Sequence, residues 1–339
     1  MVRVIIAAII GMVIAIVVGP RFISFLRREE LGQQIREELG HHVAKQGTPI
    51  LGGLLIMIAM TIAFLSMSEF TIPAITVFLV TLACAGIGFA DDFIKLTHRR
   101  SLGLSGRWKL LLLAGITVGI GYAAYRVGLP KWVYIPILDV RPNLSWFWYV
   151  LIFLIVAGAA NGVNLTDGID GLAAGTGIIA LIAFTAVSAL TYIRNRDTND
   201  LDMAILGGAL VGASVGFLWF NAFPAEVFMG DTGSMAIGGA IGAFAVFSKT
   251  EILMIIIGGI FLVEALSVII QVISFKFWER RVFLMAPIHH HFEMKAWSGT
   301  KIMVRFWIVG AILGSAAFAL YYRYFLGFHP VRYFPTFHK

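Results

Sequence analysis

The chain has 339 residues, of which 59% are hydrophobic and only 13% are charged. Soluble globular proteins carry about 25% charged residues, so this composition excludes a soluble enzyme and indicates a polytopic membrane protein. The net charge of +7 is then a sign of orientation in a lipid bilayer and not of nucleic-acid binding, and the single cysteine, Cys84, excludes a disulfide framework.

Ten apolar segments are long enough to cross a membrane. A helical span takes about 20 residues, and backbone groups in hydrocarbon must pair within a helix or a closed barrel. The segments are too long for barrel strands, and no small-residue cleavage site follows the first, which excludes a signal peptide. The sequence predicts an all-α, polytopic protein with about ten transmembrane helices in one domain, residues 1–339, with spans at 4–26, 50–68, 72–90, 109–126, 146–164, 172–193, 202–220, 234–248, 251–275 and 303–326.

The distribution of Lys and Arg predicts the orientation. With ten spans, both termini lie on one side of the membrane. The loops after the odd-numbered spans hold fifteen Lys and Arg residues, and the opposite set, termini included, holds ten. Cytoplasmic loops carry the excess of these residues, so we expect both termini to be non-cytoplasmic. On that side, residues 127–145 are expected to form a small β-hairpin.

Five polar motifs fall on the predicted cytoplasmic face. They are Asp91 and Asp92 after the third span, Asn164, Asp167, Gly168 and Asp170 after the fifth, Asn221 and Asp231 after the seventh, His289, His290 and His291 after the ninth, and Lys45 and Thr48 before the second. Each alone has an ordinary explanation: an Asp pair at a helix end can be solvated, and Asp231 or Thr232 can cap the eighth helix. Ionisable residues near the membrane are by default functional, so the five together predict one site.

The residue types of this site favour phosphoryl transfer. Carboxylates are hard oxygen ligands of the kind that hold Mg²⁺ together with substrate phosphates. Lys45, Lys95 and Lys109 provide point charges for phosphate, and the glycine-rich turns before the sixth and eighth helices direct amides at an anion. A metal, lysines and helix termini around a diphosphate are the parts of a phosphoryl-transfer site. The sequence contains no Walker A motif, which excludes a P-loop ATPase.

Four motifs carry a family resemblance. DDFIK (91–95), NLTDGIDGLA (164–173), NAFPAEVFMGDTGS (221–234) and APIHHHFE (286–293) resemble the polyprenyl-phosphate N-acetylhexosamine-1-phosphate transferases, and the uninterrupted histidines resemble their bacterial N-acetylmuramoyl-pentapeptide branch. The resemblance implies that undecaprenyl phosphate attacks the β-phosphorus of UDP-N-acetylmuramoyl-pentapeptide and that UMP leaves. It also implies Mg²⁺ as cofactor, a role in peptidoglycan synthesis, a homodimer, and the bacterial cytoplasmic (inner) membrane with the active face cytoplasmic.

The resemblance also implies roles for single residues. Asp231 is expected to be the principal Mg²⁺ ligand with Asp92 beside it, and Asp91 is the candidate base or orienter of the lipid phosphate. We expect one-step displacement. His290 is expected to act in catalysis, and His289 and His291 to contact the diphosphate or the sugar. The residues expected around the uridine are Asn164, Asp167, Asp170, Phe228 and Gln271, and the remaining substrate-binding candidates are Lys45, Thr48, Lys95, Lys109, Gly168 and Asn221.

Several alternatives stay open at this stage. Phe228 is either a base-stacking ring or a packing aromatic. Glu264 and Gln271, seven residues apart in the ninth span, either line the cleft or form an interhelical pair. An ion-coupled transporter is the main rival function, and it predicts acidic residues near the bilayer midplane on inverted halves. A scaffold without catalysis leaves the acidic cluster unexplained.

Overall fold

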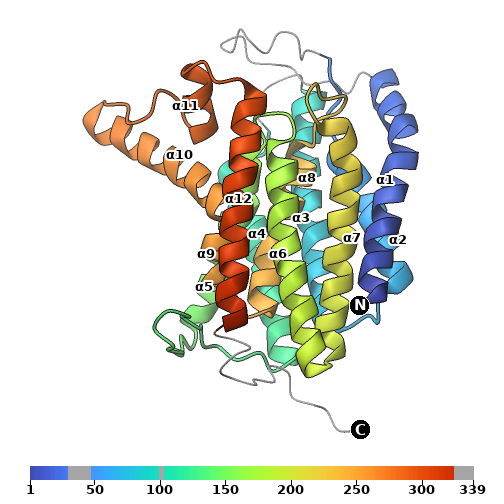
Figure 1. Cartoon of the computed structure of the whole chain (residues 1–339). Helices are drawn as coiled ribbons and strands as arrows, with labels where there is room; N and C mark the ends of the chain where they lie inside the picture. The colour runs from blue at the N-terminus through green and yellow to red at the C-terminus, as the bar shows by residue number, and fades with distance from the viewer. Residues whose placement is uncertain (30–46, 99–102, 324–339) are drawn as a thin grey trace.

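A computed structural model describes residues 1–29, 47–98 and 103–323 as a helical bundle (Figure 1). Within these ranges it contains helices and no β-sheet, so the predicted all-α polytopic class is confirmed. The helices are α1 (Val2–Arg28), α2 (Gly52–Met67), α3 (Ile72–Thr97), α4 (Gly106–Arg126), α5 (Phe147–Thr166), α6 (Leu172–Asn195), α7 (Thr198–Asn221), α8 (Gly230–Phe247), α9 (Leu253–Ile257), α10 (Gly259–Trp278), α11 (Ile288–Met294) and α12 (Gly299–Tyr321).

Eight described helices are long and apolar enough to cross a membrane: α1, α3, α4, α5, α6, α7, α10 and α12. The predicted spans at 50–68 and 234–248 correspond to α2, with 16 residues, and α8, with 18. α2 is too short to be counted among the eight, and the first turn of α8 holds the polar residues Asp231 and Thr232.

The sequence predicted one helix at 251–275, whereas the structure has two helices there. α9 ends at Ile257 and α10 begins at Gly259, with Gly258 between them. Glycine has the lowest helix propensity after proline, and two in succession allow the axis to change direction here. In Figure 1, α10 projects away from the bundle at the end where α11 lies. An apolar pattern alone does not reveal this break, because both pieces are equally apolar.

Three further details differ from the prediction. The third span was expected to end at residue 90, but α3 continues to Thr97, so Asp91 and Asp92 lie inside the helix and not after it. Polar residues extend a helix beyond its apolar part when they pair with each other, as Asp91 and Lys95 do at i and i+4. The histidine motif, expected in a loop, forms α11. The predicted hairpin is limited to two antiparallel bridges, Trp132–Asn143 and Ile135–Val140.

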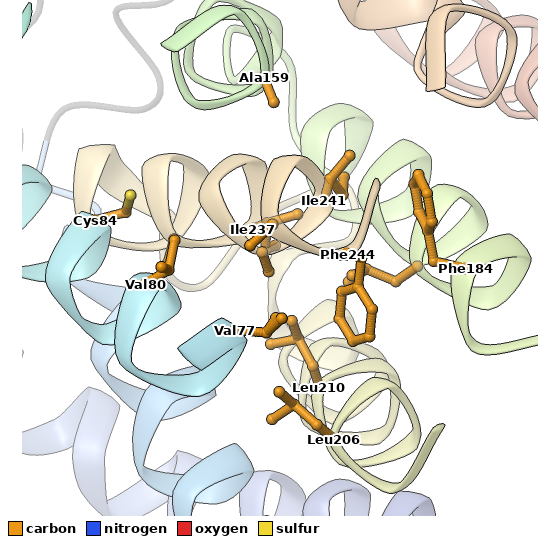
Figure 2. Close-up of a cluster of buried hydrophobic side chains, with 14 of the residues drawn as sticks. Val77, Val80, Cys84, Ala159, Phe184, Leu206, Leu210, Ile237, Ile241 and Phe244 are labelled. Carbon is orange, nitrogen blue, oxygen red and sulfur yellow. The ribbon is translucent and has the colours of Figure 1, made fainter. Parts of the chain in front are cut away.

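α8 is the central helix of the bundle. Every residue from Thr232 to Phe247 is buried. Figure 2 shows side chains of α3, α5, α6 and α7 gathered around α8, and the rings of Phe184 and Phe244 stack with their centroids 6.2 Å apart. Neighbours on several sides hold α8 in place, which fixes the position of its first turn and of Asp231.

Candidate functional site

Three carboxylates converge where α3 meets the first turn of α8. Asp91, Asp92 and Asp231 each offer an oxygen within 4.8 Å of the others, and Asp91 and Asp92 are only 1% and 2% exposed. The approach depends on Gly88, one turn before the Asp pair, because a Cβ there would overlap the carbonyl oxygen of Asp231. A glycine contact between two helix backbones therefore brings together carboxylates that are about 140 residues apart in the chain.

Two lysines balance the charge of Asp91 and Asp231. The Lys95 ammonium lies 2.5 Å from Asp91 Oδ2 and 3.1 Å from Asp231 Oδ1. The Lys109 ammonium, from the first turn of α4, lies 2.7 Å from Asp231 Oδ2 and 3.0 Å from Asp91 Oδ1. Each ammonium thus bridges both carboxylates, which offsets the repulsion between them. The Asp231 side chain is 14% exposed, against 1% for Asp91, so it is the more accessible of the two.

Asp92 has a different set of partners. Its Oδ1 accepts from the Asp231 amide at 3.1 Å, and its Oδ2 accepts from the Thr232 amide at 2.9 Å and the Thr232 hydroxyl at 2.7 Å. Asp92 therefore caps α8 from a neighbouring helix, where a negative charge is favourable. The alternative that Asp231 or Thr232 supplies the cap is wrong, because neither side chain turns back to the helix amides.

Replacing Asp92 by Asn is expected to destabilise the protein by about 1–3 kcal/mol. Asn offers one acceptor oxygen and would turn an NH₂ group toward one of the α8 donors. Thermal unfolding in detergent measures the loss, with Glu226→Gln as a control because Glu226 is exposed in the loop before α8. An unchanged midpoint in the Asp92→Asn variant would show that the cap contributes nothing.

The turn after α5 is joined to the segment before α8. Asn164 donates to the Ser234 hydroxyl at 3.0 Å, and the Gly171 amide donates to Asn221 Oδ1 at 3.1 Å. The Asp170 carboxylate accepts from the Ala225 amide at 3.2 Å. The side chains of Asn164, Asn221 and Asp170 therefore hold these two motifs side by side.

Asp167 directly follows α5 and faces the same cluster. Burial, with the nearby charges of Asp231, Asp92 and Asp170, raises the pKa of its carboxyl to about 7, although a hydrogen bond from the Gly230 amide acts in the opposite direction. Ordinary Asp carboxyls titrate near 3.9. Asp167 is therefore a group whose charge a bound cation would stabilise.

The segment before α2 pairs with the segment before α8. The Phe228 amide donates to the Pro49 carbonyl at 2.8 Å, and its carbonyl accepts from the Gly52 amide at 2.9 Å. The Phe228 side chain is half-buried and packs against the core, and Thr48 is half-buried beside this pairing. Lys45, also expected at the site, lies outside the described residues.

Each of the three histidines contacts a different neighbour. His289 Nδ1 lies 3.1 Å from Glu264 Oε1, and His290 Nδ1 lies 2.6 Å from Glu293 Oε2. His291 Nδ1 accepts from the Leu284 amide at 3.1 Å. Only His289 is buried.

His289 also reaches the turn after α5. A Cβ on Gly168 would overlap its Nε2. Through this contact α11 is joined to the turn that includes Asp167, and through that turn to the acidic cluster. The three carboxylates, Lys95 and Lys109 thus meet directly, whereas the histidines stand one layer away.

Gln271 and Glu264 are not bonded to each other. Gln271 accepts from the amides of Val282 and Phe283 at 3.1 and 3.0 Å and donates to the Phe283 carbonyl at 3.1 Å. Its amide group therefore holds the chain that follows α10, a role that the sequence does not reveal. Glu264 pairs with His289 of α11, so its bond joins two helices, in line with the interhelical alternative considered from the sequence.

Sequence reasoning missed two contributors to this site, Ser234 and Leu104, and considered Thr232 only as a cap of its own helix. Thr232 shares the bond to Asp92, Ser234 binds Asn164, and the Leu104 amide donates to Asp91 Oδ1 at 2.7 Å. The first two lie in the recognised MGDTGS motif, so their position is a signal that could have found them. The Leu104 amide could not be found in this way, because the type of a residue does not indicate what its backbone N–H will bind.

Comparison with known proteins gives consistent results. The family model described as glycosyl transferase family 4 matches residues 74–249, which include most of α3 and all of α8. A protein of Halalkalibacterium halodurans is 45% identical over 317 residues, covering 92% of this chain and 95% of its own length. One of Rubrobacter xylanophilus is 43% identical over 330 residues, with 95% and 98% covered. Both bear the name phospho-N-acetylmuramoyl-pentapeptide-transferase.

Proposed function

The chain belongs to the phospho-N-acetylmuramoyl-pentapeptide-transferases of glycosyl transferase family 4, and we propose that it transfers phospho-N-acetylmuramoyl-pentapeptide from its UDP conjugate to undecaprenyl phosphate. An oxygen of the lipid phosphate attacks the β-phosphorus of the donor, the bond to the UMP oxygen breaks, and UMP leaves. The product is a lipid-linked diphosphate sugar, the first membrane intermediate of peptidoglycan synthesis.

The observation that carries this proposal is the carboxylate cluster bridged by two ammonium groups. Lys95 and Lys109 each contact Asp91 and Asp231, and they are free to exchange a carboxylate for a phosphate oxygen when substrate binds. Phosphoryl transfer depends mainly on such positioning and charge neutralisation. Asp91, beside both lysines, orients the lipid phosphate or accepts its proton. The second pKa of a phosphate monoester is about 6, so the lipid phosphate is mostly deprotonated at neutral pH. It can attack the donor directly, and we therefore favour one-step displacement over a covalent aspartyl-phosphate.

The donor set of the cluster fits Mg²⁺. It contains only carboxylate oxygens within 4.8 Å of one another, and such hard donors suit this ion. Asp231 would hold the ion because it is the most exposed of the three acids, and Asp92 would support it through the oxygen lone pairs that α8 leaves unused. When bound, the ion supplies positive charge to the diphosphate.

Transfer is expected to depend on Mg²⁺. In an assay with a radiolabelled UDP-N-acetylmuramoyl-pentapeptide and undecaprenyl phosphate, label moves into the organic phase with Mg²⁺, stops moving after EDTA, and resumes when Mg²⁺ is restored. Transfer that persists in EDTA would contradict the metal assignment. Substrate flux into vesicles without any transfer would favour the transporter instead.

We place this site at the cytoplasmic face of the bacterial inner membrane, in a homodimer. The excess of Lys and Arg in the loops on the site's side supports the orientation. A cysteine at Glu226, beside the site, is expected to resist a membrane-impermeant maleimide in intact spheroplasts, whereas one at Ile137, in the bridge-linked segment, is labelled. Both positions are exposed, and the native Cys84 is buried. Labelling of the cysteine at Glu226 and not of the one at Ile137 would contradict the proposed orientation.

A further inference from the structure

Glu264 is a carboxyl group buried inside an apolar helix. It lies in the second turn of α10 and is 0% exposed. Burying an ionisable side chain in a membrane-spanning helix costs free energy, and such side chains almost always pair with another polar group. The partner here is His289, whose Nδ1 lies 3.1 Å from Glu264 Oε1.

The other nitrogen of His289 faces the turn after α5. His289 is 1% exposed, and its Nε2 has no hydrogen-bond partner among the described residues. The same nitrogen contacts Gly168, since a Cβ there would overlap it. A buried polar atom without a partner costs about 1–3 kcal/mol, so an imidazole held in this orientation is suited to a ligand that completes its bonding.

His290 differs in both respects. It pairs with Glu293 on its own helix, and the two side chains are 14% and 25% exposed. Its orientation therefore comes from a partly solvated contact within α11. His289 alone among the three histidines is held by a fully buried acid from another helix.

We propose that Glu264 is a positioning residue that orients His289 for the donor substrate, an inference that rests on the proposed function. A carboxylate only accepts hydrogen bonds, so His289 carries its proton on Nδ1 and presents the lone pair of Nε2 to the Gly168 turn. There Nε2 accepts a hydrogen bond from a hydroxyl or amide N–H of the bound sugar. Removing the outer partner of a metal-bound histidine changes affinity or activity by about 10–100-fold, and we expect an effect of that size for His289.

Kinetics of three variants test this role. Glu264→Leu is expected to lower kcat by about 30-fold, because His289 loses its orienting acceptor. Glu264→Gln retains an acceptor oxygen for Nδ1–H. Its kcat is therefore expected to be at least about threefold higher than that of Glu264→Leu. Ser267→Ala is the matched control. Ser267 is buried one turn away on α10, and within the described part of the chain its hydroxyl bonds only to the Glu264 carbonyl. It should stay within threefold of the wild type.

A spectroscopic readout separates positioning from a structural role. In protein labelled with ¹⁵N-histidine, His289 is assigned by its loss in His289→Gln. We expect the Nδ1–H tautomer in the wild type and in Glu264→Gln, and a mixture of tautomers in Glu264→Leu. If Glu264→Leu does not fold, Gly168→Ala provides the second test, because it displaces Nε2 and leaves Glu264 intact.

Two results would overturn the inference: an unchanged tautomer with unchanged kcat in Glu264→Leu, or a Glu264→Gln variant as impaired as Glu264→Leu. Failure of the proposed function is distinguishable from either result. In that case the wild type transfers no label at all, while the ¹⁵N signals still report the state of His289.

Discussion

Asp231→Asn is expected to lower kcat for transfer by about 1000-fold or more while the fold is retained. Removing one group that stabilises developing charge in an active site costs about 100–1000-fold, and Asp231 carries two functions at once. It is the most accessible acid of the cluster, and it holds both Lys95 and Lys109 through its two oxygens. The Asn side chain has no charge to hold a cation or the two ammonium groups. Steady-state transfer and thermal unfolding of the same preparation measure the two effects.

Glu226→Gln is the matched control for this experiment. Glu226 lies five residues earlier, in the loop before α8. It is exposed, and its side chain makes no hydrogen bond or ion pair with the residues that the structure describes. The same change of charge should leave kcat within twofold. Near-normal turnover of Asp231→Asn would contradict the assignment of this acid, whatever the control shows.

Gly88→Ala is expected to destabilise the protein by about 1–3 kcal/mol, as overpacking a tight contact does. The added methyl group would overlap the Asp231 carbonyl, so α3 and α8 must separate. Separation also moves Asp91 and Asp92 away from Asp231, and transfer should fall with stability. Thermal unfolding in detergent and the transfer assay measure both effects.

Gly86→Ala provides the comparison on the same helix. Nothing lies within 4 Å of a Cβ at Gly86, and Ala favours a helix over Gly by about 0.5–1 kcal/mol. This variant should be as stable as the wild type or slightly more stable, with normal transfer. Equal effects of the two substitutions would mean that the close helix crossing at Gly88 is unimportant.

Much of the fold follows from the sequence because hydrocarbon imposes a simple rule. Apolar runs of about 20 residues must be helices, and the expected segments agree with most of the observed helices. Helix ends are another matter. α3 continues through Asp91 and Asp92 because its polar residues pair along the helix, and the break at Gly258 depends on how α10 packs. Apolar composition reports neither effect.

The site was predictable in residue type and not in geometry. Five motifs on one expected face, with the lysines predicted to bind phosphate, led to Asp91, Asp231 and Lys109 as members of one site, and these residues do lie in contact. The backbone partners of Asp92 and Gln271 were not predictable. Every residue type except proline offers the same backbone N–H donor and, with it, a C=O acceptor, so the residue types do not show which of these groups will bind.

The amino-acid sequence by itself determined the class of this protein, the approximate number of helices, and the kinds of group that would meet at one end of the bundle. Apolar length and residue chemistry are local properties that the chain states directly. Only the tertiary structure decided which acid caps α8, which histidine faces inward with Glu264, and how closely α3 approaches α8 at Gly88. Those outcomes depend on contacts between distant segments at separations of a few ångströms, and packing sets such separations.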